Sequence, residues 1–302
     1  MKIDLSNIQK FGSIELLAKQ LVEGFITGLH KSPYHGFSVE FAEHRLYNPG
    51  ESTRNIDWKV YAKTDRLYSK RFEEETNLRC MLVIDNSPSM HYPEPNKDKI
   101  KFSLLMAASL AHLLQRQRDA VGLTTFAEDL EIQTPVKSSG SHLHKLLLQI
   151  EHVMGEKHQV KKGTDVPKVL HQIATKLHKR SLVVIFSDMF DRQENQEQMF
   201  SALQHLKHQK HEVLLFHITD KNTEVDFDFE DRPYEFIDIE NDQVIKAHPS
   251  QIRDYYQKAT QSYFEKLKLR CGQAKIDFIE VDTKGDYEQV LLSYLIKRQK
   301  MI

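Results

Sequence analysis

Residues 81–89 read Met81-Leu82-Val83-Ile84-Asp85-Asn86-Ser87-Pro88-Ser89, an apolar run that ends in an Asp and two hydroxyls. The apolar part predicts a short buried strand. The strand therefore delivers one carboxylate and two alcohols into a single tight loop, in the pattern D-x-S-x-S. A hard divalent cation prefers oxygen ligands of this kind and keeps some of its water.

Two further loops carry oxygen ligands at strand ends. Gly163-Thr164-Asp165 opens a helical stretch, and Ser187-Asp188 follows the apolar run 181–186. In an open parallel sheet, ligands bind outside the carboxyl ends of the strands, so all three loops are expected to meet. The sequence therefore predicts a Mg²⁺ site, with Mn²⁺ or Ca²⁺ as alternative ions, whose ligands are Asp85, Ser87, Ser89, Thr164 and Asp188.

Each of these positions also has a simpler interpretation. Ser87 and Ser89 can build a turn, and Thr164 can cap the helix that follows it. Asp188 can likewise cap the next helix. The metal interpretation is favoured because all of these residues lie together at strand ends.

From about residue 77 onward, strands and helices alternate along the chain. This repeated order predicts an α/β domain with a doubly wound, mostly parallel sheet and helices on both faces. The segment 130–136 is expected to return as an edge hairpin. The expected strands are 80–84, 121–126, 181–186, 212–218 and 276–281, and the expected helices are 97–118, 141–154, 165–179, 193–209, 249–269 and 287–300.

The N-terminal part, 1–76, is expected to hold a helix and a small β-rich appendage. The segment 36–72 alternates apolar and polar residues around the turn Asn48-Pro49-Gly50, which predicts strands. The segment 8–29 predicts an amphipathic helix that packs on the body of the protein. Its apolar residues at helical spacing are Leu16, Leu17, Leu21, Phe25 and Ile26.

The α/β domain, 77–302, is expected to contain an insertion at about 224–248. The runs Val225-Asp226-Phe227-Asp228-Phe229 and Tyr234-Glu235-Phe236-Ile237-Asp238-Ile239 alternate apolar with acidic residues. This alternation is typical of exposed edge strands.

The ordered set of five predicted ligands resembles the metal-ion-dependent adhesion site (MIDAS) of von Willebrand factor type A domains. That resemblance implies a von Willebrand factor A-like fold and a binding module. In that family the hydroxyls ligate the metal directly, the two carboxylates act largely through water, and a partner's carboxylate completes the coordination. Neutral ligands leave much of the cation's charge uncompensated, so an incoming carboxylate is strongly attracted.

A second resemblance covers nearly the whole chain, from about residue 35 to 298. The hallmark Y-x-P-G-[DE]-x-x-R-x-I-D-W of the bacterial family called domain of unknown function fifty-eight is similar to Tyr47-Asn48-Pro49-Gly50-Glu51-Ser52-Thr53-Arg54-Asn55-Ile56-Asp57-Trp58. The chain departs from the family at Lys63, where an Arg is usual, and at Asn241-Asp242, where Thr-Gly is usual. Neither departure touches a predicted metal ligand.

Members of that family are typically encoded beside MoxR-type AAA+ ATPases. The resemblance therefore implies a partner or adaptor of such an ATPase in protein assembly or maturation. The implied partners are the ATPase and a client protein that supplies an acidic side chain. No enzymatic activity is implied.

Composition excludes other classes of protein. The chain has 302 residues with 42 basic and 43 acidic side chains, and a net charge of −1 argues against a nucleic-acid binder. Its two cysteines lack metal-type spacing and favour a reduced compartment. The N-terminus lacks the apolar core of a signal peptide, and no apolar run is long enough for a membrane span. We therefore expect a cytoplasmic protein.

Two rival functions stay open. A magnesium-dependent phosphatase or phosphotransferase would use Asp85 as nucleophile and Asp188 for the metal. Such enzymes of the haloacid dehalogenase type carry D-x-D, however, and Ser87 cannot move a proton as a carboxylate does. A structural scaffold would keep the metal site unused. The role of one further group of residues also stays open. These residues either form a surface that contacts a partner or form an internal ion-pair and packing cluster. They are Arg54, Asp57, Trp58, Arg66 and Lys70.

Overall fold

The computed structural model describes residues 14–30, 44–46, 58–70, 78–155, 165–190, 196–239 and 243–299. The chain forms two compact units, one of Gly24–Asn77 and a larger one of Met1–Glu23 with Leu78–Ile302. The larger unit carries the α/β fold.

The main sheet of the larger unit has six strands, of which only the edge strand β5 is antiparallel. The first and fourth of these strands along the chain, β3 and β6, are neighbours, and successive strands run outward from them in both directions. This is a doubly wound order, so the crevice between β3 and β6 is its topological switch point. In spatial order the strands are β10 (Asp277–Asp282), β7 (Glu212–Thr219), β6 (Leu182–Ser187), β3 (Arg79–Asp85), β4 (Ala120–Phe126) and β5 (Leu130–Gln133).

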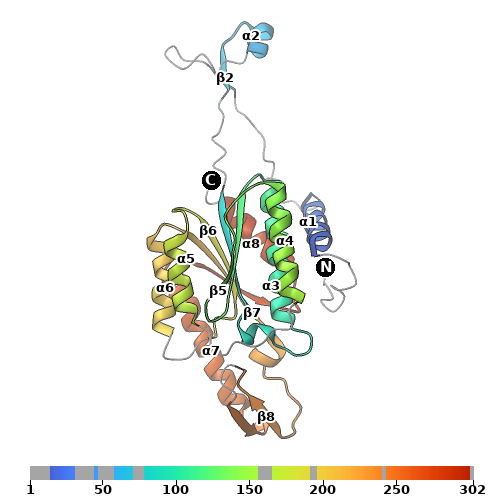
Figure 1. Cartoon of the computed structure of the whole chain (residues 1–302), viewed down its shortest axis with the longest axis vertical. Helices are drawn as coiled ribbons and strands as arrows, with labels where there is room; N and C mark the ends of the chain where they lie inside the picture. The colour runs from blue at the N-terminus through green and yellow to red at the C-terminus, as the bar shows by residue number, and fades with distance from the viewer. Residues whose placement is uncertain are drawn as a thin grey trace. The chain divides into compact units, whose positions relative to one another are not determined.

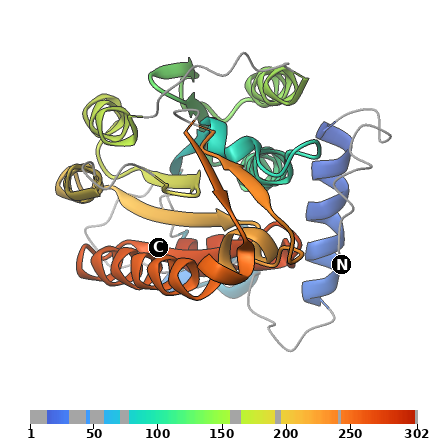
Figure 2. The ribbon, with the colours of Figure 1, turned by 90° about the horizontal axis from the view of Figure 1, so that it is seen from below.

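Helices cover both faces of the main sheet. Figures 1 and 2 show α5 and α6 on one side and α3 and α4 on the other. The predicted doubly wound, mostly parallel sheet with helices on both faces is therefore confirmed. The helices are α3 (Asp98–Arg116), α4 (Gly140–Gly155), α5 (Val166–Lys176), α6 (Gln196–His208), α7 (Pro249–Gln273) and α8 (Glu288–Gln299).

Strand β3 is buried on both of its faces, which explains its unbroken apolar run. Met81 and Val83 point into the cluster that α5, α6 and α7 close. On the other face, Ile84 is in register with Phe186 of β6, whose ring stacks on that of Phe216 at 5.1 Å. The apolar sequence thus places the carboxyl end of β3 in the middle of the sheet.

Gly122 on β4 leaves room for the side chains of Val136 and Met81 to pack against the strand. A Cβ atom at Gly122 would lie 3.0 Å from Val136 Cγ2 and 3.1 Å from Met81 Cε. We expect Gly122→Ala to lower the free energy of unfolding by about 1–2 kcal/mol, because an overpacked side chain must shift. Urea denaturation measures this, with Gly272→Ala as control: nothing lies near that helical Cβ position, so Ala there should be neutral or stabilising. Equal effects of the two variants would contradict the packing argument.

The N-terminal helix α1 (Ile14–His30) forms as predicted, and its first residues bond to side chains of α4. The backbone N–H of Ile14 donates to the Glu151 carboxylate at 3.0 Å. The predicted residues Leu17, Leu21 and Phe25 are buried, but the prediction for Leu16 was wrong because this residue is 48% exposed. The buried stripe is completed by Ile14, Ala18 and Val22.

The predicted insertion forms an arm, which we define as residues 221–247. A single π-helical turn (Lys221–Val225) leads to the antiparallel hairpin of β8 (Tyr234–Ile237) and β9 (Val244–Ala247). The alternation at 225–229 does not form the expected strand. Phe227 has a φ angle of 49° and packs its ring on Tyr256 of α7 at 4.5 Å, so the backbone turns there instead of extending.

Besides the end of α1, the described residues of the smaller unit form a two-stranded antiparallel sheet and one short helix. Strand β1 (His44–Leu46) pairs with β2 (Tyr68–Lys70), and α2 (Trp58–Thr64) lies between them in sequence. The helix ends where Thr64 Oγ1 donates to the Val60 carbonyl at 2.8 Å.

Candidate metal centre

The carboxylate of Asp85 lies at the switch point of the main sheet and is 1% exposed. Its Oδ1 accepts a hydrogen bond from the Ser87 backbone N–H at 2.9 Å, and its Oδ2 accepts one from Ser187 Oγ at 2.6 Å. Both donors are neutral. They orient the carboxylate, but they do not balance its charge.

The hydroxyls of Ser87 and Ser89 meet beside Asp85. Their Oγ atoms are 3.0 Å apart, with Ser87 at the N-cap position of a 3-10 turn (Pro88–His91) and Ser89 inside that turn. The same loop is held by the edge strand β5, where Glu131 Oε2 accepts a hydrogen bond from the Asn86 amide nitrogen at 2.7 Å. Carboxylate and hydroxyl oxygens therefore converge at the end of β3.

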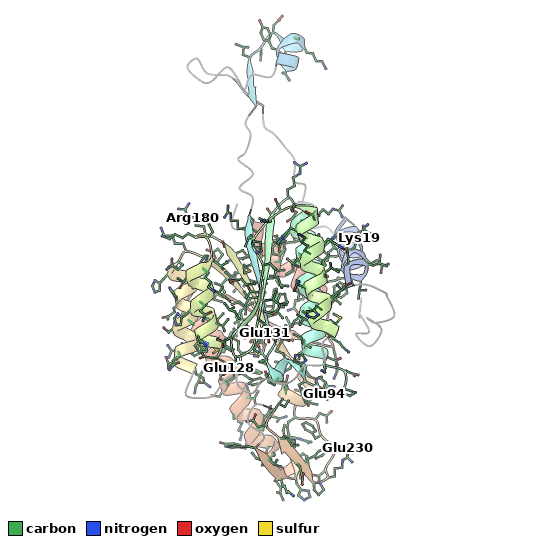
Figure 3. The ribbon with its side chains drawn as sticks, in the orientation of Figure 1. Lys19, Glu94, Glu128, Glu131, Arg180 and Glu230 are labelled. Atoms are coloured by element: carbon green, nitrogen blue, oxygen red, sulfur yellow. The ribbon has the colours of Figure 1, made fainter. Side chains whose placement is uncertain are left out.

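The second predicted carboxylate, Asp188, is fully buried after β6. Its Oδ2 accepts a hydrogen bond from the Lys99 ammonium at 2.9 Å, and its Oδ1 accepts one from the Phe190 backbone N–H at 3.2 Å. Lys99 also donates to Glu224 Oε1 of the arm, at 2.5 Å. Figure 3 labels Arg180 at one end of the larger unit and Glu94 and Glu230 toward the other end. Because Arg180 precedes β6, the end with Glu94 and Glu230 is the carboxyl end of the parallel strands.

Burial changes the proton affinity of this cluster. It raises the pKa of Asp85 to about 7, and the nearby charge of Asp188 adds to the rise. Burial lowers the pKa of His217, which lies on β7 beside Asp188, to about 4, so that its imidazole is neutral. Burial also opposes the charge of Lys99, but Asp188 and Glu224 outweigh it and raise the lysine pKa above its ordinary value.

The donor set fits a hard divalent cation. Asp85 is a buried carboxylate whose two hydrogen-bond donors are neutral, and two hydroxyl oxygens lie beside it. Oxygen ligands of this kind suit Mg²⁺. Within the described ranges, no group of three or more His, Cys, Asp or Glu side chains forms a metal site, so a site here depends on the hydroxyls.

The predicted ligands divide into those the structure brings together and one it does not describe. Asp85, Ser87, Ser89 and Asp188 lie together at the ends of β3 and β6, whereas Thr164 lies outside the described residues. The helix after it, α5, is capped by Asp165, whose Oδ1 accepts from the Lys168 N–H at 3.0 Å. Capping of α5 is therefore supplied without the Thr164 hydroxyl.

The second predicted surface is described only in part. Arg54 and Asp57 lie outside the described residues, and for Trp58 and Lys70 only the backbone is described. Arg66 is exposed. The choice between a partner surface and an internal cluster stays a prediction.

Sequence reasoning missed Lys99. A signal was present, because Lys99 lies at helical spacing with the buried residues Ser103, Met106 and Leu110 of α3 and so occupies the apolar stripe of that helix. Glu224 carried no comparable signal, since it is one of many acids in the insertion.

A family model described as "Protein of unknown function DUF58" matches residues 43–265. The chain belongs to this family. Uncharacterized protein Rv1480 of Mycobacterium tuberculosis (strain ATCC 25618 / H37Rv) is 26% identical over 176 residues, which are 58% of this DUF58 chain and 55% of the relative. Uncharacterized protein Mb1516 of Mycobacterium bovis matches with the same values. The chain thus spans about half the length of the curated relatives it matches.

Solved structures resemble this DUF58 protein at low sequence identity. An aerotolerance-related membrane protein from Bacteroides fragilis NCTC 9343 is 14% identical, with a TM-score of 0.46, over 73% of this chain and 99% of that one. The conserved hypothetical protein BatB from Bacteroides thetaiotaomicron is 13% identical, with a TM-score of 0.46, over 74% and 99%. Among the described residues, no helix has the length and apolar character that a membrane crossing requires.

Proposed function

We propose that this DUF58 protein is a non-enzymatic, metal-dependent protein-interaction module. Mg²⁺, or Mn²⁺ or Ca²⁺ in its place, is held by Asp85, Ser87, Ser89, Thr164 and Asp188, and an acidic side chain of the partner completes the coordination. The observation that carries the proposal is the buried, charge-uncompensated Asp85 at the switch point, with two hydroxyls beside it. Ligands bind at this point in doubly wound sheets.

The partner class follows from the family resemblance. We propose a MoxR-type AAA+ ATPase as the partner, in the cytoplasm, with a client protein as a further source of the acidic side chain. The protein then acts as an adaptor in protein assembly or maturation.

The test is a pull-down of a MoxR-type ATPase from the same genome with the purified protein, in Mg²⁺ and in EDTA. Such an ATPase needs Mg²⁺ for its own nucleotide, so a loss of binding in EDTA alone does not identify the cause. The decisive measurement therefore uses the Ser87→Ala/Ser89→Ala variant in Mg²⁺. We expect this variant to bind Mg²⁺ roughly tenfold more weakly or worse by titration calorimetry, and to lose the partner. Ser109→Ala, whose hydroxyl bonds to the Leu105 carbonyl inside α3, is the matched control. Metal and partner binding that survive in the double variant would refute the proposal.

The two rival functions make different demands. A phosphatase of the haloacid dehalogenase type needs a second carboxylate two residues after its nucleophile, and Ser87 holds that place. An unused scaffold would have its open coordination position filled by a clashing group or by a buried side-chain carboxylate of the chain itself. The side chain that reaches Asp188 is the ammonium of Lys99, so titration of the unmodified protein with Mg²⁺ decides between the scaffold and the metal-dependent module.

A further inference from the structure

A buried lysine connects the candidate metal centre to the arm. The Nζ atom of Lys99 lies 2.9 Å from Asp188 Oδ2 and 2.5 Å from Glu224 Oε1, and its side chain is fully buried. Asp188 follows β6, whereas Glu224 lies in the π-helical turn Lys221–Val225. This turn begins the root of the arm, which we define as residues 221–229. One ammonium therefore bonds both to a predicted metal ligand and to the arm.

The charges around Lys99 match one divalent ion. Asp85, Asp188 and Glu224 carry three carboxylates against a single ammonium, which leaves a formal charge of −2 when all are ionised. A divalent cation beside Asp85 and Asp188 would balance this charge. It would also repel the ammonium that shares Asp188, since like charges at such distances interact strongly away from water.

Two aromatic rings restrict the movement of the Lys99 ammonium. The Tyr92 and Phe190 rings lie 5.7 Å and 5.8 Å from its Nζ atom. Within this enclosure the two carboxylates are its hydrogen-bond acceptors, so an ammonium displaced from Asp188 keeps Glu224 as its partner.

Resting on the proposed function, we infer that Lys99 is an internal counter-ion that competes with the metal ion for Asp188. Metal binding moves the ammonium toward Glu224 and so tightens the root of the arm. The metal centre and the arm are thereby coupled in one protein, before any partner binds.

The root of the arm is built so that Glu224 controls it. The Glu224 Oε2 atom accepts from the Asp220 N–H at 2.8 Å, and its carbonyl accepts from the Tyr256 hydroxyl at 3.0 Å. Two amides close the turn: Asp226 N–H donates to the Lys221 carbonyl at 2.9 Å, and Asp228 N–H donates to the Asn222 carbonyl at 2.8 Å. These amides report on how tightly the root is held.

The first experiment is hydrogen exchange of the unmodified full chain, in excess Mg²⁺ and in EDTA. We expect the amides of 221–229 to exchange several-fold more slowly in Mg²⁺, whereas those of the remote α4 stay unchanged. Exchange at the root that is unchanged or faster in Mg²⁺ would overturn the coupling.

The second experiment measures Mn²⁺ affinity by electron paramagnetic resonance, with Mn²⁺ as the probe. Lys99→Met should bind Mn²⁺ at least about tenfold more tightly, because a competing charge is removed. Lys97→Met removes the same charge from a residue that pairs only with Glu94 among the described residues, and should change little. Glu224→Gln should weaken binding, because Asp188 is then the only charged partner of Lys99 among the groups that the ammonium bonds to. Glu235→Gln on the exposed part of the arm is its control.

The outcomes separate this inference from the proposed function. If the unmodified protein binds Mn²⁺ and Lys99→Met and Glu224→Gln behave like their controls, the inference fails and the metal site stands. If only Lys99→Met binds Mn²⁺, the lysine is the competitor inferred here and the metal-dependent function fails. If no variant binds Mn²⁺, both fail. A Lys99→Met protein that does not fold leaves the decision to Glu224→Gln and to hydrogen exchange of the unmodified chain.

Discussion

Lys99→Met is expected to lower the free energy of unfolding of the metal-free protein by about 3–5 kcal/mol, because removing one partner of a buried ion pair leaves uncompensated charge in the interior. Here two carboxylates, Asp188 and Glu224, would lose their shared ammonium. The methionine can fill the space of the lysine stem but not neutralise either carboxylate. Urea denaturation in EDTA at about pH 8, where ordinary carboxyls are ionised, measures the loss.

Lys97→Met is the matched control for this stability measurement. Lys97 lies two residues earlier, and its ion pair with Glu94 is long, at 3.8 Å, with the glutamate 69% exposed. Exposed pairs contribute at most about 1 kcal/mol, so this variant should unfold almost as the unmodified protein does. A loss at Lys99 no larger than that at Lys97 would show that the buried carboxylates do not depend on the ammonium.

The sheet and the loop at the end of β3 were predictable because both depend on short-range sequence patterns. The apolar run 81–84 is buried on both faces, and Asp85, Ser87 and Ser89 follow it in one turn, so their proximity comes from adjacency in the chain. The neighbourhood of Asp188 was also predictable, since parallel strands end at a common edge.

Contacts that depend on tertiary packing were not predictable in the same way. Phe227 alternates with polar neighbours as a strand residue does, yet its packing on Tyr256 turns the backbone away from an extended path. The Lys99–Glu224 bond joins α3 to the arm across most of the domain sequence. Periodicity places Lys99 on a buried face of α3, but it does not say which acidic residue among many meets it.

Asp85→Asn is expected to make the metal-free protein more stable at about pH 8, by about 2–4 kcal/mol, since a tenfold change in a proton-binding constant corresponds to about 1.4 kcal/mol. The pKa of Asp85 in the folded protein is about 7, because the carboxyl is buried and lies near Asp188. Asparagine has nearly the same shape and carries no charge. Its amide oxygen can still accept from the Ser87 N–H.

The stabilising effect of Asp85→Asn depends on pH and on metal. Because the folded-state pKa of Asp85 is raised above its unfolded value of about 3.9, the stabilisation from holding the proton is complete below about pH 4 and is lost as the pH rises through about 7. The advantage of Asp85→Asn should therefore vanish near pH 4 and be complete above pH 7. Excess Mg²⁺ should stabilise the unmodified protein through binding to the folded state, but not the variant.

Asp188→Asn tests whether burial or pairing decides these effects. Both aspartates are buried, but Asp188 has the Lys99 ammonium as a partner, whereas both donors to Asp85 are neutral. Asp188→Asn should therefore destabilise the metal-free protein at about pH 8, because it removes one partner of a buried ion pair, whereas Asp85→Asn stabilises it. Denaturation curves of both variants in EDTA and in Mg²⁺ measure the contrast. If both variants destabilise the metal-free protein equally, the Asp85 charge is satisfied without a cation, and the physical reason for a metal at this site is removed.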